Sequence, residues 1–264
     1  MKKTREYFQY LYRFRYFWIY LVRCDLIARY RRSKLGMLWI IISPLLLTLI
    51  ISLVFGTVFH QPMKEYAPYI MVGMITWDII SVCFVANGIT FISAESYIRQ
   101  FDHPVSMYTF KSTVVSMVNF TIALIGLLIW SIFINPLNMI LGIVTLPLTM
   151  ALLFLLGWSL TTISSFLNTK FRDYPQMMAL VMQTLWYMSP VFFQESMFDG
   201  NPILRTWFGL NPITHLLYLL RKPFLYGQIP SAADYGFTLL LVLICGVIAI
   251  GINKQNSKKV IFYL

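Results

Sequence analysis

The feature that most constrains this chain is a series of long apolar runs that carry almost no charge. The first run lies between Lys34 and Lys64, and no charged residue occurs inside it. A helix needs about 20 apolar residues to cross the hydrocarbon core of a bilayer. Charged residues make up only 12% of the chain, against about 25% in soluble domains. The sequence therefore indicates an integral membrane protein.

Six of these runs are candidate membrane spans, so the predicted fold is an all-α membrane protein with six transmembrane helices. They cover residues 37–59, 69–93, 112–134, 139–163, 177–193 and 236–252. The last two are short and lie near the lower length limit for a span.

The distribution of Lys and Arg predicts the orientation. With six spans, both termini and the second and fourth loops share one side of the membrane, which then carries 17 of the 21 basic residues. The other side has only Lys64, Arg205, Arg221 and Lys222. Cytoplasmic loops are enriched in basic residues, so both termini are expected in the cytoplasm. The net charge of +11 then reflects topology and contact with anionic membrane lipids, and no nucleic-acid partner is expected.

The segments around the predicted transmembrane domain, 37–252, have their own patterns. Residues 1–36 place basic and apolar side chains on opposite helical faces, as in a helix that lies in the membrane interface. This segment ends in a basic cluster made of Arg29, Arg31, Arg32 and Lys34. The cluster is expected to anchor the chain at the cytoplasmic surface, and any further role is left open.

Two more segments complete the predicted organisation. In the outer region, 194–235, two short helices hinged at Asn211-Pro212 fit better than a seventh span. They are expected to form a re-entrant helical pair, which a membrane tolerates where it lines protein or a watery cavity. Residues 253–264 form a basic cytoplasmic tail.

The sequence offers little chemistry of its own. It contains no G-x-x-x-x-G-K-[ST] motif, so ATP binding of the P-loop type is excluded, and it contains no H-E-x-x-H motif. Cys24, Cys83 and Cys245 are far apart, and their spacing gives neither a disulfide framework nor a zinc site. No catalytic residue, bound metal or cofactor is therefore predicted in this chain.

Asp78 is the one acidic residue well inside a predicted span. A carboxylate there costs roughly 2.5–3.5 kcal/mol on insertion scales, which makes it a candidate functional residue. The alternative is a structural aspartate that is protonated or hydrogen-bonded beside Thr76 and Trp77.

Aromatic residues are dense on the first and fifth predicted spans. Most aromatic residues near span ends form interfacial belts, but aromatic faces also stack on the apolar faces of sugar rings. The residues that we interpret as a candidate substrate path are Trp39, Phe55, Phe59, Trp186, Tyr187, Phe192 and Phe193.

Four short motifs resemble one family of membrane proteins. Residues 25–44 follow the pattern D-L-x-x-R-Y-x-x-S-x-L-G-x-L-W-x-x-x-x-P, and residues 167–173 follow L-N-x-x-x-R-D. Ser189-Pro190-Val191 and Leu210-Asn211-Pro212 supply the other two motifs in order. Together they resemble the permease subunits of polysaccharide ABC exporters, over residues from about 25 to 227. Such exporters move O-antigen, capsule or teichoic acid chains.

The resemblance implies several properties. The permease is expected to form a homodimer that binds two copies of a separate ATPase subunit, which would hold ATP and Mg²⁺. Residues 1–36 resemble the interface helix of the family, and the loop 94–111 resembles its coupling segment. The coupling residues that it implies are Arg99, Gln100, Phe101, Asp102, His103, Pro104 and Val105.

The function expected from the resemblance is export of lipid-linked polysaccharide across a bacterial inner membrane by a non-enzymatic transport subunit. Three alternatives stay open at this point. The chain is instead a proton-coupled secondary transporter that uses Asp78, a membrane enzyme that modifies glycans or lipids, or an ABC permease for a drug or a small lipid.

Overall fold

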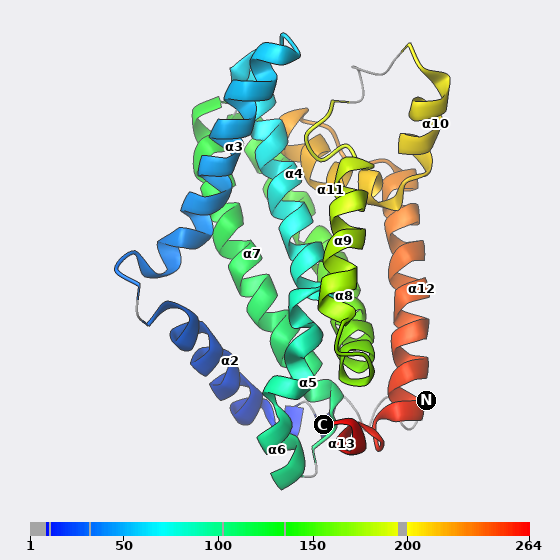
Figure 1. The fold of residues 1–264 in the computed structure, drawn as a ribbon. Coiled ribbons are helices and arrows are strands. Elements are labelled where there is room, and N and C mark those ends of the chain that lie inside the picture. Colours follow the sequence, from blue (N-terminus) through cyan, green and yellow to red (C-terminus); the bar gives the residue numbers. More distant parts are fainter. Residues whose placement is uncertain (1–8, 11, 32, 102, 135, 195–199) are drawn as a thin grey trace.

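The computed structural model describes residues 9–264 except 11, 32, 102, 135 and 195–199. Helices are the only regular elements of this described part (Figure 1). At the start of the chain they are α2 (Arg15–Tyr30), η1 (Gly36–Leu38), α3 (Trp39–Val58), α4 (Met63–Phe84), η2 (Ala86–Ile89), α5 (Thr90–Ser93) and α6 (Glu95–Gln100). They continue as α7 (Ser106–Ile134), α8 (Pro136–Lys170), α9 (Tyr174–Tyr187), α10 (Pro202–Leu210), α11 (Pro212–Leu225), α12 (Ala232–Asn256) and α13 (Val260–Tyr263).

Five helical stretches of the described residues are long and apolar enough to cross a membrane. They lie at the first, second, third, fourth and sixth predicted spans, and they cover Gly36–Val58, Met63–Ser93, Ser106–Ile132, Asn138–Lys170 and Ala232–Asn256. The predicted fifth span, 177–193, is not among these five stretches. Helix α9 has 14 residues, which at 1.5 Å per residue reach about 21 Å, less than the roughly 30 Å of a hydrocarbon core. Beyond it the chain continues as a non-helical turn, residues 188–193, which we call the distal turn.

The helices form a bundle with two distinct ends (Figure 1). The start of α2, the short helix α6 and the C-terminal α13 gather at one end, which we call the basal end. The α3–α4 turn and α10 lie at the opposite, distal end. Helix α4 is central, since 61% of its most apolar stretch is buried, whereas the same measure for α3 is 11%. One face of α3 therefore lies open in the isolated chain.

Helix α4 is interrupted near the basal end, where η2 and α5 follow it. The break releases backbone carbonyl groups from helical hydrogen bonds, and buried carbonyl groups need donors. Hydroxyl groups on α8 and α9 supply them: Thr161 and Ser164 donate to Cys83, Tyr174 donates to Phe84 and Ser165 donates to Asn87, at 3.0–3.3 Å. The break is thus fixed by its neighbours, and it turns the chain from α4 toward α6.

The two short helices predicted in the outer region are present as α10 and α11. Asn211 separates them, and its side chain caps α11 by accepting a hydrogen bond from the Ile213 amide at 2.9 Å. Buried His215 ties three elements together, because its ring nitrogens lie 2.9 Å from the Asp234 carboxylate on α12 and 3.0 Å from the Gly209 carbonyl of α10. The placement of this pair relative to a membrane stays a prediction.

Candidate functional site

Six of the seven aromatic residues of the candidate path lie in one cluster at the distal end. Phe55 lies on α3 and Phe59 follows its last residue, and their ring centroids are 5.5 Å from Phe192 and 5.9 Å from Phe193, respectively. On the other side of Phe192 lies Trp186 of α9, with the rings stacked at 4.8 Å. Tyr187 joins the cluster through Trp186, at 4.9 Å. The fold therefore brings the first and fifth predicted spans together through their aromatic side chains.

The cluster is unevenly buried. Phe192 is only 3% exposed, so most of its surface packs inside the chain, whereas Tyr187 is 56% exposed. Trp39 does not belong to the cluster, because it lies at the other end of α3, where it is 45% exposed. The seven residues thus form one packed group and one separate tryptophan.

A groove between α4 and α9 leads to this cluster. It has a volume of about 420 Å³ and is lined by both helices. Trp77, Trp186 and Tyr187 supply aromatic walls, and Ser81 and Gln183 supply polar groups. A surface of this kind can stack on the apolar faces of a ligand and form a few hydrogen bonds with its polar groups.

The distal turn that carries Phe192 and Phe193 is held by polar contacts from α4 and α11. Tyr66 donates a hydrogen bond to the Phe192 carbonyl at 2.8 Å, and Tyr69 donates to the Phe193 carbonyl at 2.6 Å. Arg221 is fully buried, and its guanidinium donates to the Pro190 and Val191 carbonyls at 2.6 Å each. We call these contacts of Arg221 with the distal turn and with Tyr69 the Arg221 clamp.

The packing of the distal turn also explains two of the sequence motifs. The Asn211 amide of the L-N-P motif donates to the Ser189 hydroxyl of the S-P-V motif at 3.0 Å. Gly73 of α4 leaves the space that the turn occupies, because a Cβ atom there would overlap the Val191 carbonyl and lie 2.7 Å from Arg221. The two motifs are therefore parts of one packed structure.

Four residues that hold the distal turn were not predicted as site residues: Arg221, Tyr66, Tyr69 and Gly73. Arg221 counted only as an outer basic residue, although it interrupts an apolar run on α11. An arginine in such a run is a signal for a buried charge with dedicated acceptors. The tyrosines and the glycine gave no comparable signal, because their role depends on a turn more than 100 residues away in sequence.

The predicted coupling segment lies at the basal end and packs against α2. Helix α6 holds Arg99 and Gln100, and Arg99 forms an exposed ion pair with Glu95 at 2.9 Å. His103 stacks on Phe101, with ring centroids 5.6 Å apart, and contacts Phe14 at 4.4 Å.

Val105 ends the coupling segment. It follows Pro104, is 6% exposed, and belongs to a buried group that includes Leu21 of α2 and Val260 of α13. Asp102 lies outside the described residues. The coupling segment thus packs against both the N-terminal helix α2 and the C-terminal helix α13.

The basic cluster lies where α2 ends. Arg29 is in the last turn of α2, and Arg31 and Lys34 are exposed in the connection to η1; Arg32 lies outside the described residues. The apolar face of α2 packs on the protein, because Trp18 contacts Phe110 at 5.2 Å and Leu21 is buried. Residues 1–8, which the predicted amphipathic pattern includes, also lie outside the described residues.

Asp78 lies on α4 with its side chain exposed in the isolated chain. It has no hydrogen bond or ion pair with another described residue.

The chain is similar to a known protein family and to known proteins. Residues 16–225 match the ABC-2 type transporter family. The O-antigen export system permease protein RfbA of Myxococcus xanthus is 26% identical over 234 residues, which cover 84% of this chain and 85% of the relative. A protein of the same name from Klebsiella pneumoniae is 24% identical over 241 residues, which cover 89% of each chain. The match covers most of the chain, and the long apolar helices are those of a membrane protein. The chain therefore belongs to the ABC-2 type transporter family and is a multi-pass membrane protein.

Proposed function

We propose that this protein is the permease subunit of a bacterial exporter that moves lipid-linked polysaccharide, of the O-antigen, capsule or teichoic acid type, across the inner membrane. The observation that carries the proposal is the similarity, over most of both chains, to permeases named for O-antigen export. The aromatic cluster and the α4–α9 groove supply surfaces of the kind that a sugar polymer needs. ATP hydrolysis belongs to a separate ATPase subunit, because this chain has no P-loop motif.

The proposed assembly is a homodimer with two ATPase subunits. The largely unburied α3 and the exposed side of α9 supply a face for a second copy. Both termini would be cytoplasmic, together with α6 and α13, which share the basal end (Figure 1). In this arrangement α9 and the distal turn together make the fifth crossing, so the proposed topology keeps six crossings with one that is not helical throughout.

The proposed path depends on weak attraction. A channel fails when one site binds its cargo too tightly to release it. Stacking of a base on an aromatic ring contributes roughly 1–3 kcal/mol, and stacking of a sugar is taken to be no stronger. Rings that follow one another along α9 and α3 would therefore guide a chain of sugars without holding any one unit.

The proposed coupling route starts at the basal end. An ATPase that docks on α6 would push on the break in α4, because α5 and η2 connect α6 to it directly. The Tyr174 hydroxyl at the start of α9 donates to the Phe84 carbonyl at this break, at 3.0 Å. A displacement of α6 would thus reach both walls of the α4–α9 groove.

Two measurements test the proposed function. Affinity purification of this chain from its native host should recover an ATPase subunit, and deletion of the chain should remove polysaccharide from the cell surface. If no ATPase subunit copurifies and deletion leaves the surface polysaccharide unchanged, the proposal is refuted. Export of a drug or a small lipid instead would support the alternative of a small-molecule ABC permease.

The aromatic path has its own test. Single alanine variants of Phe55, Phe59, Trp186 and Tyr187 should slow export modestly, because neighbouring rings remain. The combined variant should nearly abolish export while the ATPase still copurifies. Full export by the combined variant at normal membrane abundance would reject the path. A fall in abundance alone would show that these rings serve packing.

A further inference from the structure

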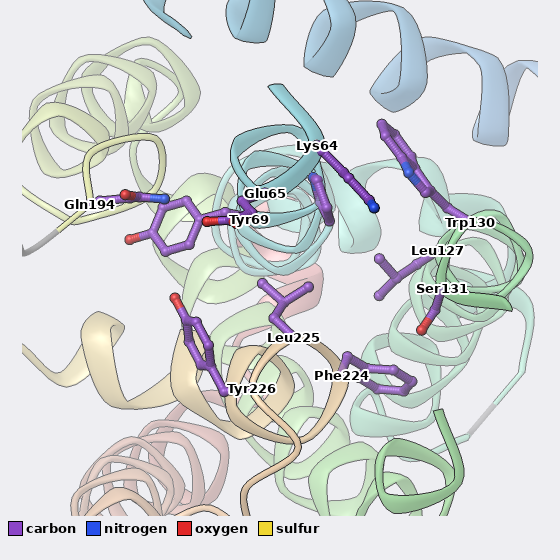
Figure 2. Close-up of a pocket in the computed structure, with 11 residues that line it drawn as sticks. Lys64, Glu65, Tyr69, Leu127, Trp130, Ser131, Gln194, Phe224, Leu225 and Tyr226 are labelled. Carbon is purple, nitrogen blue, oxygen red and sulfur yellow. The ribbon is translucent and has the colours of Figure 1, made fainter. Parts of the chain in front are cut away.

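A second cavity lies at the distal end, between α4, α7 and the end of α11 (Figure 2). Its volume is about 480 Å³, which lies within the roughly 300–1,000 Å³ that is usual for sites of small ligands. Figure 2 shows Lys64 and Trp130 on one side of this space, and Tyr226 and Gln194 on the other. The cavity is separate from the α4–α9 groove, and no residue lines both.

Four polar side chains that line this cavity have no hydrogen-bond or ionic partner among the residues that the structure describes. They are the Lys64 ammonium, the Glu65 carboxylate, the Ser131 hydroxyl and the Gln194 amide. Ser131 is 8% exposed and lines the cavity beside Trp130, whereas Lys64 and Glu65 are exposed at its edge. These groups offer donors and acceptors to a ligand that fills the cavity.

Aromatic rings form much of the remaining wall. Trp130 closes the cavity on the α7 side, and Phe224 and Tyr226 close it at the end of α11. Tyr69 also lines the cavity, although its hydroxyl group binds Arg221 and the distal turn and Arg221 covers one face of its ring. Flat rings beside separate donors and acceptors match a molecule that has apolar faces and hydroxyl edges.

We propose that this cavity binds a sugar unit of the exported chain at the distal end of the permease; this inference rests on the proposed function. Each sugar hydroxyl both donates and accepts a hydrogen bond, so it can satisfy the Glu65 carboxylate as well as the Lys64 ammonium. The C–H faces of the sugar ring pack on Trp130 and Tyr226. One positive and one negative side chain give the cavity no net charge, which favours a neutral ligand over a phosphate.

The position of the cavity gives this site its role. Gln194 follows Phe193 directly, and Tyr69 belongs both to the Arg221 clamp and to the cavity wall. The cavity therefore adjoins the aromatic cluster, and a sugar that has passed the cluster meets it next. Occupation of the site would retain the emerging chain near its exit between transport steps.

Binding of free sugars to the purified full-length protein tests the proposal without the ATPase. The protein in phosphatidylcholine nanodiscs is examined by saturation-transfer NMR with methyl glycosides of glucose, galactose, mannose, rhamnose and N-acetylglucosamine. At least one glycoside should receive saturation at its ring C–H protons. Glu65→Gln and Trp130→Ala should each weaken its binding about tenfold, the effect of losing one hydrogen bond to a charged group or one stacking ring.

Matched variants distinguish a lost contact from a lost fold. Trp130→Phe keeps a ring and should restore most of the binding that Trp130→Ala loses. Glu95→Gln changes the same residue type at the basal end and should bind the glycosides as the wild type does. Every variant is also checked for its melting temperature. Absence of any bound glycoside, or equal binding by wild type, Glu65→Gln and Trp130→Ala, would overturn the proposal.

A lipid head group is the competing occupant. If phosphatidylethanolamine added to the nanodiscs removes all glycoside binding, and Glu65→Gln removes the binding of that lipid, the cavity is a lipid site and the proposal is wrong. The experiment also distinguishes a failure of this sugar site from a failure of the proposed function. Copurification of an ATPase without glycoside binding would reject this site alone, and glycoside binding without an ATPase partner or polysaccharide export would reject the proposed function alone.

Discussion

Arg221 donates a hydrogen bond from its guanidinium to the carbonyl oxygen of Val191, at 2.6 Å. The two residues belong to α11 and to the turn after α9, and Arg221 is fully buried. No carboxylate among the described residues pairs with this arginine. Its charge is met by backbone carbonyl groups and by the ring of Tyr69, whose centroid lies 3.6 Å away. A cation thus holds the turn that carries two rings of the aromatic cluster.

Replacement of Arg221 should destabilise the protein strongly. Each hydrogen bond to a charged group contributes about 1.5–3 kcal/mol, so Arg221→Ala should lower the free energy of unfolding by about 3 kcal/mol or more. Arg221→Lys should rescue little of this, because a single ammonium group cannot reproduce the planar fork of the guanidinium. Melting of the purified protein measures both, with exposed Arg23→Ala as the control. A melting temperature of Arg221→Ala equal to that of the control would contradict the clamp.

Gly73 should not accept a side chain. In Gly73→Ala the new Cβ atom would meet the Val191 carbonyl and lie 2.7 Å from Arg221, so the turn or the arginine must move. Overpacking of this kind costs about 1–3 kcal/mol. Gly251→Ala on α12 is the matched control, because its Cβ atom has no neighbour within 4 Å. Equal melting temperatures for the two variants would show that the distal turn shifts freely.

Phe17 and His103 should be energetically coupled across α2 and the coupling segment. Their ring centroids are 5.2 Å apart, and aromatic pairs contribute about 0.5–1.5 kcal/mol beyond their buried area. A double-mutant cycle with Phe17→Ala and His103→Ala should show a coupling of that size in the free energy of unfolding. Phe17→Ala combined with the distant Phe237→Ala should be additive. Additivity in both cycles would mean that α2 and the coupling segment pack without specific contact.

The proposed topology predicts which positions an impermeant thiol reagent can reach. Single cysteines at Lys64 and Asn201 in a cysteine-free background should react in intact cells. Cysteines at Lys170 and Lys258 should react only after the cells are permeabilised, because basic loops stay in the cytoplasm. Labelling of Lys258→Cys in intact cells would rule out the proposed orientation.

Asp78→Asn should preserve export if an ATPase drives transport. The amide keeps the size of the side chain but cannot bind and release a proton as a carboxylate does, so a proton-coupled transporter would lose activity. Surface polysaccharide is compared with the membrane abundance of the variant. Loss of export at normal abundance would favour the proton-coupled alternative.

Much of the fold follows from the sequence, because apolar runs of about 20 residues have few alternatives to a membrane helix. The break at Asn211 was also predictable, since asparagine before proline favours a helix start. The length of α9 was not predictable from the sequence. Residues 177–193 are mostly apolar and carry no charge, but tyrosine and arginine side chains from α4 and α11 bind the backbone of residues 190–193 and stabilise a turn there.

The sequence predicted only part of the candidate site, because side chains from distant elements complete it. Aromatic density on two runs identified the rings that meet at Phe192. Trp39 and Phe59 lie at opposite ends of the predicted span 37–59, so their different depths were predictable. Which rings pack together was not, because the sequence gives the depth of a residue along a span but not its partner. The distal cavity was missed altogether, since Lys64, Glu65, Ser131 and Gln194 come together only when α4, α7 and the distal turn pack.

The Arg221 clamp also has a consequence for the order in which the protein is made. The ribosome completes α4 and α9 well before it reaches α11, so the distal turn has to wait for the arginine that fixes it. We expect nascent chains released before residue 221 to keep the turn accessible to proteases at the far side of the membrane. Helix α11 would then act as a checkpoint in biogenesis, at which quality-control proteases distinguish a finished permease from an incomplete one.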